Sequence, residues 1–229
     1  MLVIAHRGAS RAFPENTVAA FQGAVDQGAD GVELDVRRTA DAAQALSHDE
    51  LLPDGRAVVE LQQVELPSEV PVLAAALDVC RPLSVVNIEI KNWPDDGDFD
   101  PTEQLAADVV ALLRARGEID DGRNLVSCFH LPTIDRVREL APGLATGWLL
   151  GVIEDIAPLI ERAVAAGHVA VHPHHAFVDA DLVERAHAAG LAVNTWTCDE
   201  PDRIRWLADL GADAVITNVP DVALAALGR

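Results

Sequence analysis

Basic residues are scarce in this sequence. The 229 residues include 17 lysines and arginines against 37 aspartates and glutamates, which gives a formal net charge of −20. A surface with this charge repels the phosphate backbone of a nucleic acid, so the composition argues against a nucleic-acid-binding protein. An anionic small substrate remains possible only where a cation and a few basic side chains reverse the field locally.

Cysteines are also few, and long apolar runs are missing. Cys80, Cys128 and Cys198 lie far apart and form no CxxC pair, which argues against a disulfide framework and against a zinc knuckle. We expect these thiols to be reduced and mostly buried. No apolar run approaches the roughly 18 residues that a membrane span needs. Neither a charged leader nor a cleavage site precedes the first apolar run. We therefore expect a soluble, cytoplasmic protein without a membrane span.

The chain consists instead of short apolar runs that alternate with longer amphipathic, alanine-rich stretches. The short runs are often β-branched, which is typical of parallel strands that are covered on both faces. The predicted strands are 2–5, 31–36, 84–90, 125–129, 145–150, 169–172, 192–196 and 213–217. The predicted helices include 14–27, 101–116, 132–140, 155–166, 179–189 and 200–210.

This alternation predicts the fold. Eight strands with helices between them are the number that closes a parallel barrel, and single-domain barrels of this kind have about 250 residues. No linker or shift in composition marks a second domain. We therefore predict an α/β fold, a single-domain (β/α)8 TIM barrel over residues 1–229, with a short irregular insertion at 40–70 after the second strand. An open doubly wound sheet is the competing architecture.

Three acidic residues stand near the ends of two predicted strands. Glu33 and Asp35 are two residues apart on one strand, so their side chains share a face, and Glu89 lies in the same register of the next core strand. Carboxylates held close together repel one another unless one is protonated or a cation lies between them. Oxygen ligands without cysteine suit a hard ion such as Mg2+ or Ca2+. The alternative is that these acids cap helices or pair with arginines.

Basic and titratable residues occur at the same predicted edge of the barrel. Lys91 shares a face with Glu89, beside the predicted metal, where an ammonium could hold a phosphate oxygen. Arg7 follows the first strand and offers a bidentate fork for phosphate. His6 and His48 can titrate near neutral pH, and two such histidines on opposite sides of a scissile bond can act as base and acid.

Motifs in a fixed order along the chain resemble one enzyme family, the glycerophosphodiester phosphodiesterases. The matching segments are Ala5-His6-Arg7-Gly8, Pro14-Glu15-Asn16-Thr17, Ala20-Phe21, Gly28-Ala29-Asp30, Glu33-Leu34-Asp35-Val36, Thr39, His48-Asp49, Glu89-Ile90-Lys91, His172-Pro173, Val193-Asn194-Thr195-Trp196-Thr197 and Gly211-Ala212-Asp213-Ala214-Val215-Ile216-Thr217. A single segment such as His-Arg-Gly is a weak signal, but the ordered set is strong and covers most of the chain.

The resemblance implies a phospholipase-C-like barrel that cleaves a small-molecule glycerophosphodiester to glycerol 3-phosphate and an alcohol, as part of glycerol and lipid metabolism. It implies a divalent metal ion, Mg2+ or Ca2+, as cofactor. Residue by residue, it implies that Glu33, Asp35 and Glu89 hold the metal, that His6 and His48 are the acid–base pair, that Arg7 and Lys91 bind the phosphate, and that Trp196 lines the glycerol side.

Other residues at family positions receive supporting roles only. We assign such roles to Glu15, Asn16 and His172. The remaining histidines, His130, His168, His174, His175 and His187, are expected to be surface or structural residues. The run from His172 to His175 suggests a metal site, but it lacks helical spacing and a set of partners.

The chain departs from the family pattern in three places. Residues 40–47 lack the Asp-Gly that the family usually carries before its second histidine, which makes the alignment at His48 looser. The insertion after the second strand is short, which leaves the alcohol specificity open. Asn218 stands where an aspartate is common, and we expect this change to affect a loop rather than the chemistry.

Three other functions compete with this hypothesis. The chain could be a non-hydrolytic protein that binds a phosphate ligand, a barrel enzyme of another class that acts on a sugar phosphate, or a relative that acts on lipid head groups at a membrane. A basic patch and an apolar surface helix are missing, which argues against the last. The sequence does not tell which alcohol leaves, which metal is preferred, whether water or a glycerol hydroxyl attacks, or which oligomer forms.

Overall fold

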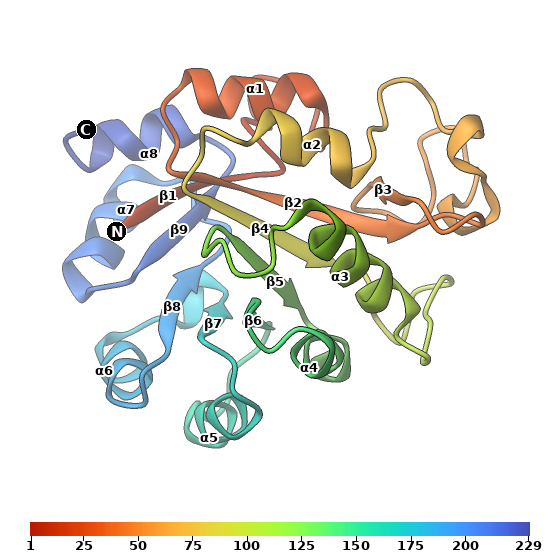
Figure 1. The fold of residues 1–229 in the computed structure, drawn as a ribbon. Helices are drawn as coiled ribbons and strands as arrows, with labels where there is room; N and C mark the ends of the chain where they lie inside the picture. Colours follow the sequence, from red (N-terminus) through yellow and green to blue (C-terminus); the bar gives the residue numbers. More distant parts are fainter.

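Eight parallel strands pair side by side until the ring closes on itself in the computed structural model, which describes residues 1–229 (Figure 1). The ring contains, in order, β1 (Leu2–His6), β2 (Gly31–Arg38), β4 (Val85–Ile90), β5 (Asn124–Cys128), β6 (Ala145–Leu150), β7 (Ala170–Pro173), β8 (Ala192–Thr195) and β9 (Ala214–Thr217). Ile4 of β1 pairs with Gly31 on one side and with Ile216 on the other, so no edge is left free. The predicted (β/α)8 barrel and its eight strands are confirmed, and the open sheet is wrong.

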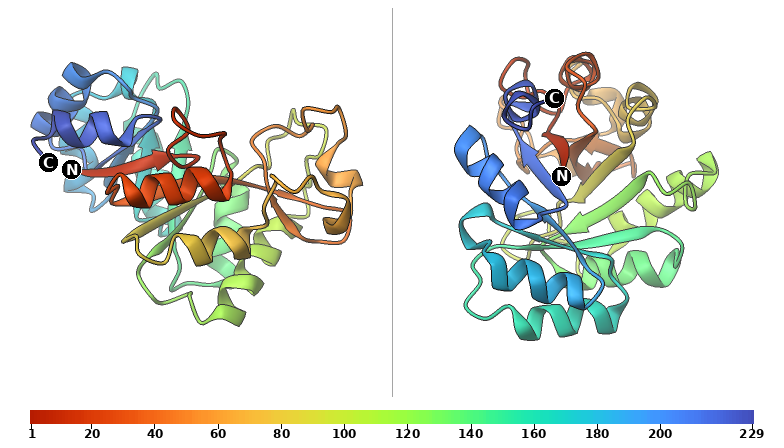
Figure 2. Two further views of the ribbon diagram at one scale, coloured as in Figure 1. Left: turned by 90° about the horizontal axis from the view of Figure 1, so that it is seen from above. Right: turned by 90° about the vertical axis from the view of Figure 1, so that its left-hand side faces the viewer.

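Eight helices surround the ring (Figure 2). They are α1 (Val18–Asp26), α2 (Leu73–Val79), α3 (Gln104–Arg116), α4 (Leu131–Leu140), α5 (Ala157–Ala166), α6 (Ala180–Ala188), α7 (Pro201–Leu210) and α8 (Pro220–Ala226). Six of them correspond to predicted ranges. The short helices α2 and α8 lie outside those ranges. Helix α1 begins later than predicted because Thr17 caps it, with its hydroxyl accepting from the backbone N–H of Ala20 at 3.2 Å. No helix is long and apolar enough to cross a membrane.

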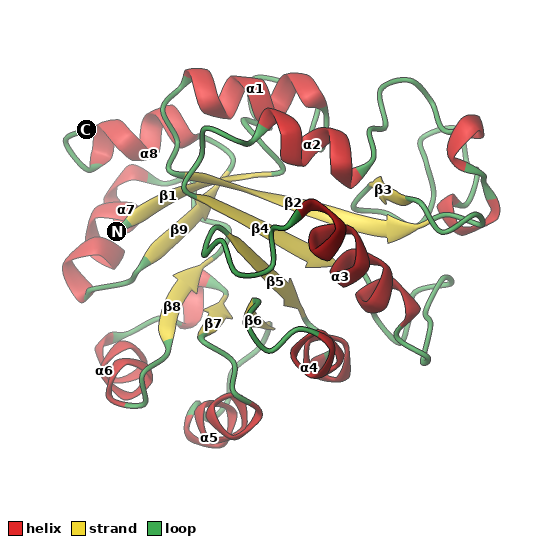
Figure 3. Cartoon of the chain, in the orientation of Figure 1, coloured by secondary structure: helices red, strands yellow, loops and turns green.

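The insertion after β2 is confirmed, and it contains more order than predicted. A short strand, β3 (Gln44–Leu46), pairs antiparallel with the end of β2, and two 3-10 helices follow, η1 (Val58–Glu60) and η2 (Gln63–Glu65). Four buried residues form its own small apolar core: Ala45, Leu52, Val58 and Leu61. Most of the remaining insertion is loop (Figure 3). It lies at the carboxyl ends of β2 and β4, at the opposite end of the barrel from the two termini (Figure 2).

Alternation along β2 separates the apolar core from the interior of the barrel. Val32, Leu34 and Val36 are fully buried in the main apolar cluster, which strands share with the surrounding helices. Glu33 and Asp35 alternate with them, so their side chains point to the inside of the barrel. The outward-facing apolar side chains hold the strand in place, and the inward-facing side chains are available for a functional site.

Buried polar side chains occur inside the barrel, where layers of branched apolar side chains are usual. His172 on β7 is fully buried there, and its Nε2 accepts a hydrogen bond from the Nδ2 of Asn194 at 3.0 Å. Burial lowers the pKa of His172 to about 3. Gly147 on β6 makes room for this ring, because a Cβ at that position would lie 2.4 Å from Nε2 of His172. The imidazole is therefore a neutral part of the packed interior.

The replacement His172→Gln should make the fold less sensitive to acid. In the unfolded chain the imidazole takes up a proton below about pH 6.5, whereas the folded protein keeps the ring neutral down to about pH 3. Its folded pKa is thus depressed, so stability is lost as the pH falls below 6.5. Between pH 6.5 and 5 this loss is about 2 kcal/mol, since each pKa unit corresponds to about 1.4 kcal/mol. Denaturant titrations of both proteins at pH 7.5 and 5 measure it. Equal losses in the two proteins would contradict this account.

Candidate active site

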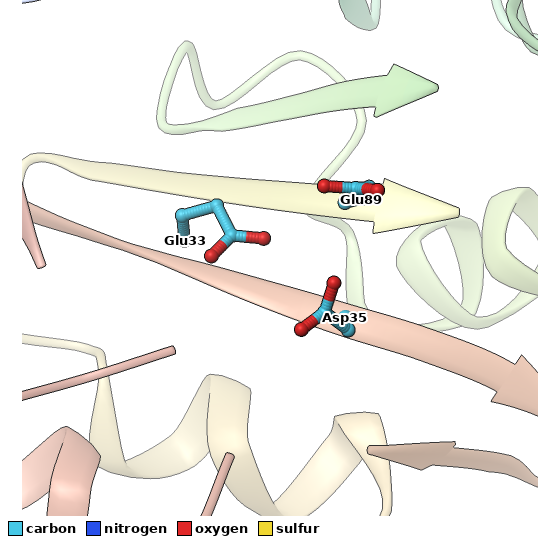
Figure 4. Close-up of side chains that lie close together, drawn as sticks. All are labelled: Glu33, Asp35 and Glu89. Carbon is cyan, nitrogen blue, oxygen red and sulfur yellow. The ribbon is translucent and has the colours of Figure 1, made fainter. Parts of the chain in front are cut away.

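Three buried carboxylates from two neighbouring strands converge (Figure 4). Glu33 and Asp35 come from β2 and Glu89 comes from β4, where it pairs directly with Asp35. One oxygen from each side chain lies within 4.8 Å of the others. The side chains point toward a shared space between the strands (Figure 4). The structure thus brings together the three acids that the sequence analysis selected.

Each charged group in this cluster shifts the pKa values of its neighbours. Burial raises the pKa of Glu33 well above its ordinary value, and the carboxylates of Asp35 and Glu89 raise it further. Burial also opposes ionisation of Asp35, but Lys91 and Arg7 hold the pKa of this carboxyl below its usual range. The ammonium of Lys91 lies 2.8 Å from Oε1 of Glu89 and 3.6 Å from Oδ1 of Asp35. Burial therefore favours the protonated forms of Glu33 and Glu89, whereas Lys91 and Arg7 favour the ionised form of Asp35.

Arg7 is held in place by a left-handed backbone conformation at the end of β1. Its φ of 56° turns its N–H toward Oε2 of Glu33, at 3.0 Å. Its guanidinium makes ion pairs with Oδ2 of Asp35 at 3.1 Å and with Oε1 of Glu15 at 2.8 Å. Gly8 follows because a Cβ there would lie 2.5 Å from the backbone of Ala20. Arg7 thus lies beside the acids with its orientation fixed on two sides.

Asn16 is the second residue that fixes the acid cluster. Its φ is also 56°, which is a tolerated conformation for asparagine. Its Nδ2 donates to Oδ2 of Asp35 at 2.8 Å, and its Oδ1 accepts from the N–H of Asp35 at 3.2 Å. Asn16 therefore orients the carboxylate of Asp35, and Glu15 orients Arg7. Both contacts agree with the supporting roles expected for these two residues.

His6 makes a hydrogen bond that the sequence analysis missed. Its Nδ1 lies 2.7 Å from Oδ1 of Asn218, whose Nδ2 donates to Oδ2 of Asp199 at 2.8 Å. Because this arrangement makes Oδ1 the acceptor, Nδ1 carries the proton and Nε2 keeps a lone pair. Nε2 lies 3.9 Å from Oε2 of Glu33. Burial lowers the pKa of His6, and Arg7 lowers it further. Asn218 thus contacts a residue of the candidate site as well as its own loop, and the expectation that its change leaves the chemistry unaffected stays a prediction.

His48 comes from the insertion rather than from a strand of the barrel. Its backbone carbonyl accepts from Nε of Arg37 at 2.9 Å, and its Nδ1 lies 2.7 Å from Oδ1 of Asp49. The guanidinium of Arg37 also donates to Asp98 at 2.6 Å and to Asp96 at 2.9 Å. The acidic loop after β4 therefore ties Arg37, and through it His48, to the mouth of the barrel.

A small cavity of about 80 Å³ joins these side chains at the mouth of the barrel. Of the predicted site residues, it is lined by His6, Arg7, Glu33, His48, Glu89, Lys91 and Trp196. Asp35 lies behind it, in contact with Arg7 and Lys91. The indole N–H of Trp196 donates to the carbonyl of His172 at 2.7 Å, which holds the ring at the cavity wall and gives His172 a supporting contact.

Further residues of the cavity were not selected from the sequence: Asn87, Phe129, Leu149, Thr197 and Ile216. Phe129 is the most informative of them, because its ring packs edge-on against Trp196 with centroids 5.3 Å apart. Its place at the end of the predicted strand 125–129 was a usable signal, since strand ends of a barrel form the catalytic rim.

The other histidines lie away from the cavity. His130, His168 and His187 each pair with a neighbouring acid, at 3.2, 3.0 and 2.9 Å respectively. His174 and His175 lie at the 3-10 helix η3 (His175–Phe177), with their ring centroids 4.6 Å apart and their planes tilted by 37°. Glu33, Asp35 and Glu89 form the single cluster of potential metal ligands, and it contains no histidine.

Comparisons with known proteins give one family for this fold and site. The model of the glycerophosphoryl diester phosphodiesterase family matches residues 6–222. A glycerophosphodiester phosphodiesterase from Caldanaerobacter subterraneus subsp. tengcongensis is 29% identical over 97% of this chain and 96% of its own length. A probable glycerophosphodiester phosphodiesterase 1 from Mycobacterium tuberculosis is 31% identical over 95% of this chain and 89% of its own.

Solved structures agree with the sequence matches. A phosphodiesterase from Oleispira antarctica, in complex with the product sn-glycerol-3-phosphate, superimposes with a TM-score of 0.89 and 27% identity, covering 100% of this chain and 97% of that chain. A glycerophosphoryl diester phosphodiesterase structure from Silicibacter pomeroyi gives a TM-score of 0.88 and 26% identity, covering 99% and 92%. The chain therefore belongs to the glycerophosphoryl diester phosphodiesterase family of hydrolases.

Proposed function

We propose that this chain hydrolyses glycerophosphodiesters to glycerol 3-phosphate and an alcohol, with a divalent cation and two histidines at the mouth of the barrel. Family membership and the Oleispira antarctica relative with its bound product, sn-glycerol-3-phosphate, support the reaction. The proposal of a metal ion, and of its position, rests on the convergence of Glu33, Asp35 and Glu89. The cytoplasmic location expected from the sequence stays a prediction.

The donor set of the acid cluster fits a hard divalent cation. Oε1 of Glu33 and Oδ1 of Asp35 are buried and have no hydrogen-bond partner, which is costly unless a cation uses them. Carboxylate oxygens without thiolates favour Mg2+ or Ca2+. When bound there, such an ion supplies positive charge against a phosphate oxygen as negative charge develops. Glu33, Asp35 and Glu89 are thus the proposed ligands.

Arg7 and Lys91 bind the phosphate in this proposal. Both are already oriented by ion pairs with the acid cluster, and both line the small cavity. Positive groups that are in place before the reaction stabilise a developing charge without any reorganisation. Trp196 forms the wall on the glycerol side.

The two histidines transfer protons on either side of the phosphate. His6 presents the unprotonated Nε2, because its Nδ1–H is bound to Asn218, so we assign it as the base for the attacking oxygen. That oxygen belongs to water or to the glycerol hydroxyl of the substrate. His48, oriented through its Nδ1 by Asp49, protonates the leaving alkoxide. Each transfer contributes roughly 10²- to 10⁴-fold to the rate.

Removal of either histidine should abolish most of the activity. His6→Ala and His48→Ala are each expected to lower kcat for glycerophosphocholine by about 100-fold or more, because one proton transfer is lost. His187→Ala is the matched control, since His187 pairs with Asp213 on the outer surface. The assay is release of choline with Mg2+ or Ca2+ and with chelator, which should silence the wild type. Near-normal turnover by His6→Ala or His48→Ala, or full activity in chelator, would disprove the assignment.

Neutralising Glu33 should stabilise the metal-free protein. The folded pKa of Glu33 is raised, so this group destabilises the fold as the pH rises above its ordinary value near 4.5. In chelator at pH 8, Glu33→Gln should therefore raise the free energy of unfolding by about 1 to 3 kcal/mol. It should also remove the stabilisation that added Mg2+ or Ca2+ gives the wild type.

Glu139→Gln is the control for this measurement, because Glu139 is exposed and pairs only with Arg136 on α4. Its unfolding free energy should change by less than about 0.5 kcal/mol. Denaturant titrations with chelator and with each cation give both quantities. A Glu33→Gln protein that is less stable in chelator, or that responds to the cation like the wild type, would refute the proposed metal site.

A further inference from the structure

A second and much larger cavity adjoins the catalytic one. Its volume is about 910 Å³, against about 80 Å³ for the small cavity. The two share five lining residues: His48, Glu89, Lys91, Phe129 and Leu149. The large cavity, here called the outer groove, therefore opens directly onto the proposed reacting centre. It is as large as pockets of roughly 300 to 1,000 Å³ that hold drug-sized ligands.

The walls of the outer groove are mainly apolar. Trp93 comes from the loop after β4, Trp148 and Leu150 from β6, Val152 from the loop after β6, and Leu159 from α5. The indole N–H of Trp148 donates to the carbonyl of Phe129 at 3.1 Å, so its ring offers only apolar surface. Trp93 and Val152 are exposed, at 45% and 79%. Exposed apolar side chains gathered at one cavity mark a binding surface.

The acidic side chains of the outer groove already have partners. Asp49 pairs with His48, Asp96 pairs with Arg37, and the carboxylate of Glu50 accepts from the N–H of Gly97. Each of these carboxylates is thus already engaged by a neighbouring group of the protein. The apolar lining is the larger surface that the groove presents to the rest of a ligand.

A continuous aromatic wall connects the outer groove to the glycerol side. The ring of Phe129 lies edge-on between Trp196, at 5.3 Å, and Trp93, at 6.1 Å. The small cavity, of about 80 Å³, has less than a tenth of the volume of the outer groove. The other half of the substrate, the leaving alcohol, must therefore extend along this wall into the groove.

We propose that the outer groove binds the alcohol half of the diester and selects alcohols that carry a large apolar group over small polar amino alcohols. The inference rests on the proposed function, and it adds the class of alcohol. The occupant is an alkyl chain or a ring system attached to the leaving oxygen, packed against Trp93, Trp148 and Leu159.

A series of alkyl esters of sn-glycerol 3-phosphate tests this proposal. Ethyl, butyl, hexyl and octyl diesters have leaving alcohols of similar acidity, so differences in kcat/KM report binding in the groove. With the cation present and below the micellar concentration, kcat/KM should rise roughly two- to fourfold for each added methylene. The octyl diester should also exceed glycerophosphocholine. A flat series, or a preference for glycerophosphocholine, would overturn the inference.

Two variants with the same exposed substitution locate the effect. Val152→Asp puts a charge into the groove, whereas Val64→Asp puts one on η2, outside it, and the two valines are 79% and 85% exposed. Val152→Asp should lower the ratio of octyl to ethyl kcat/KM by about fivefold or more, and Val64→Asp should preserve this ratio. A second groove variant, Trp93→Ala, should lower the same ratio. Trp206→Ala, which removes an exposed tryptophan from α7, is its control. Unchanged ratios of octyl to ethyl kcat/KM in both groove variants would exclude the groove as the binding site of the alcohol half.

The same assay distinguishes a failure of the proposed function from a failure of the inference about the groove. If all the alkyl diesters are hydrolysed with the same kcat/KM, the proposed function holds and the inference about the groove is wrong. If no diester in the series is hydrolysed, glycerophosphocholine included, the proposed function fails and the inference falls with it.

Discussion

Three buried carboxylates within 4.8 Å of one another cannot all be ionised unless positive charge lies among them. This constraint organises the mouth of the barrel. Arg7 and Lys91 supply part of the charge, burial raises the pKa of Glu33, and two carboxylate oxygens accept no hydrogen bond. The cluster lowers the stability of the fold. This cost is consistent with a site in which a cation and an anionic phosphate complete the set of charges.

The barrel makes this cluster possible because it separates stability from chemistry. Along β2, every second side chain packs into the apolar layer beneath the helices, while Glu33 and Asp35 face inward. Residues outside the strands then fix the orientation of the charged groups: Asn16 holds Asp35, and the insertion delivers His48 through Arg37. The net charge of −20 is no obstacle to an anionic substrate, since Arg7 and Lys91 both line the cavity.

The features of the fold and of the site that follow from local sequence patterns could be predicted. Contacts between distant segments of the chain could not. Eight apolar runs determine the strands, and the spacing of Glu33 and Asp35 determines their common face. His6 and Asn218, by contrast, are 212 residues apart, so no local pattern indicates that they touch. The outer groove was missed for the same reason. Its tryptophans come from β6 and from the loop after β4, and they become neighbours only because β4 and β6 pair on either side of β5.

Calorimetric titration of the metal-free protein with Mg2+ and with Ca2+ tests the central claim most directly. One cation should bind per chain. Burial raises the pKa of Glu33, and a bound cation lowers it, so binding should release protons over part of the pH range. The release is seen as a dependence of the heat on the ionisation enthalpy of the buffer. Absence of a one-to-one binding event with either cation, or binding without proton release at every pH tested, would contradict the account.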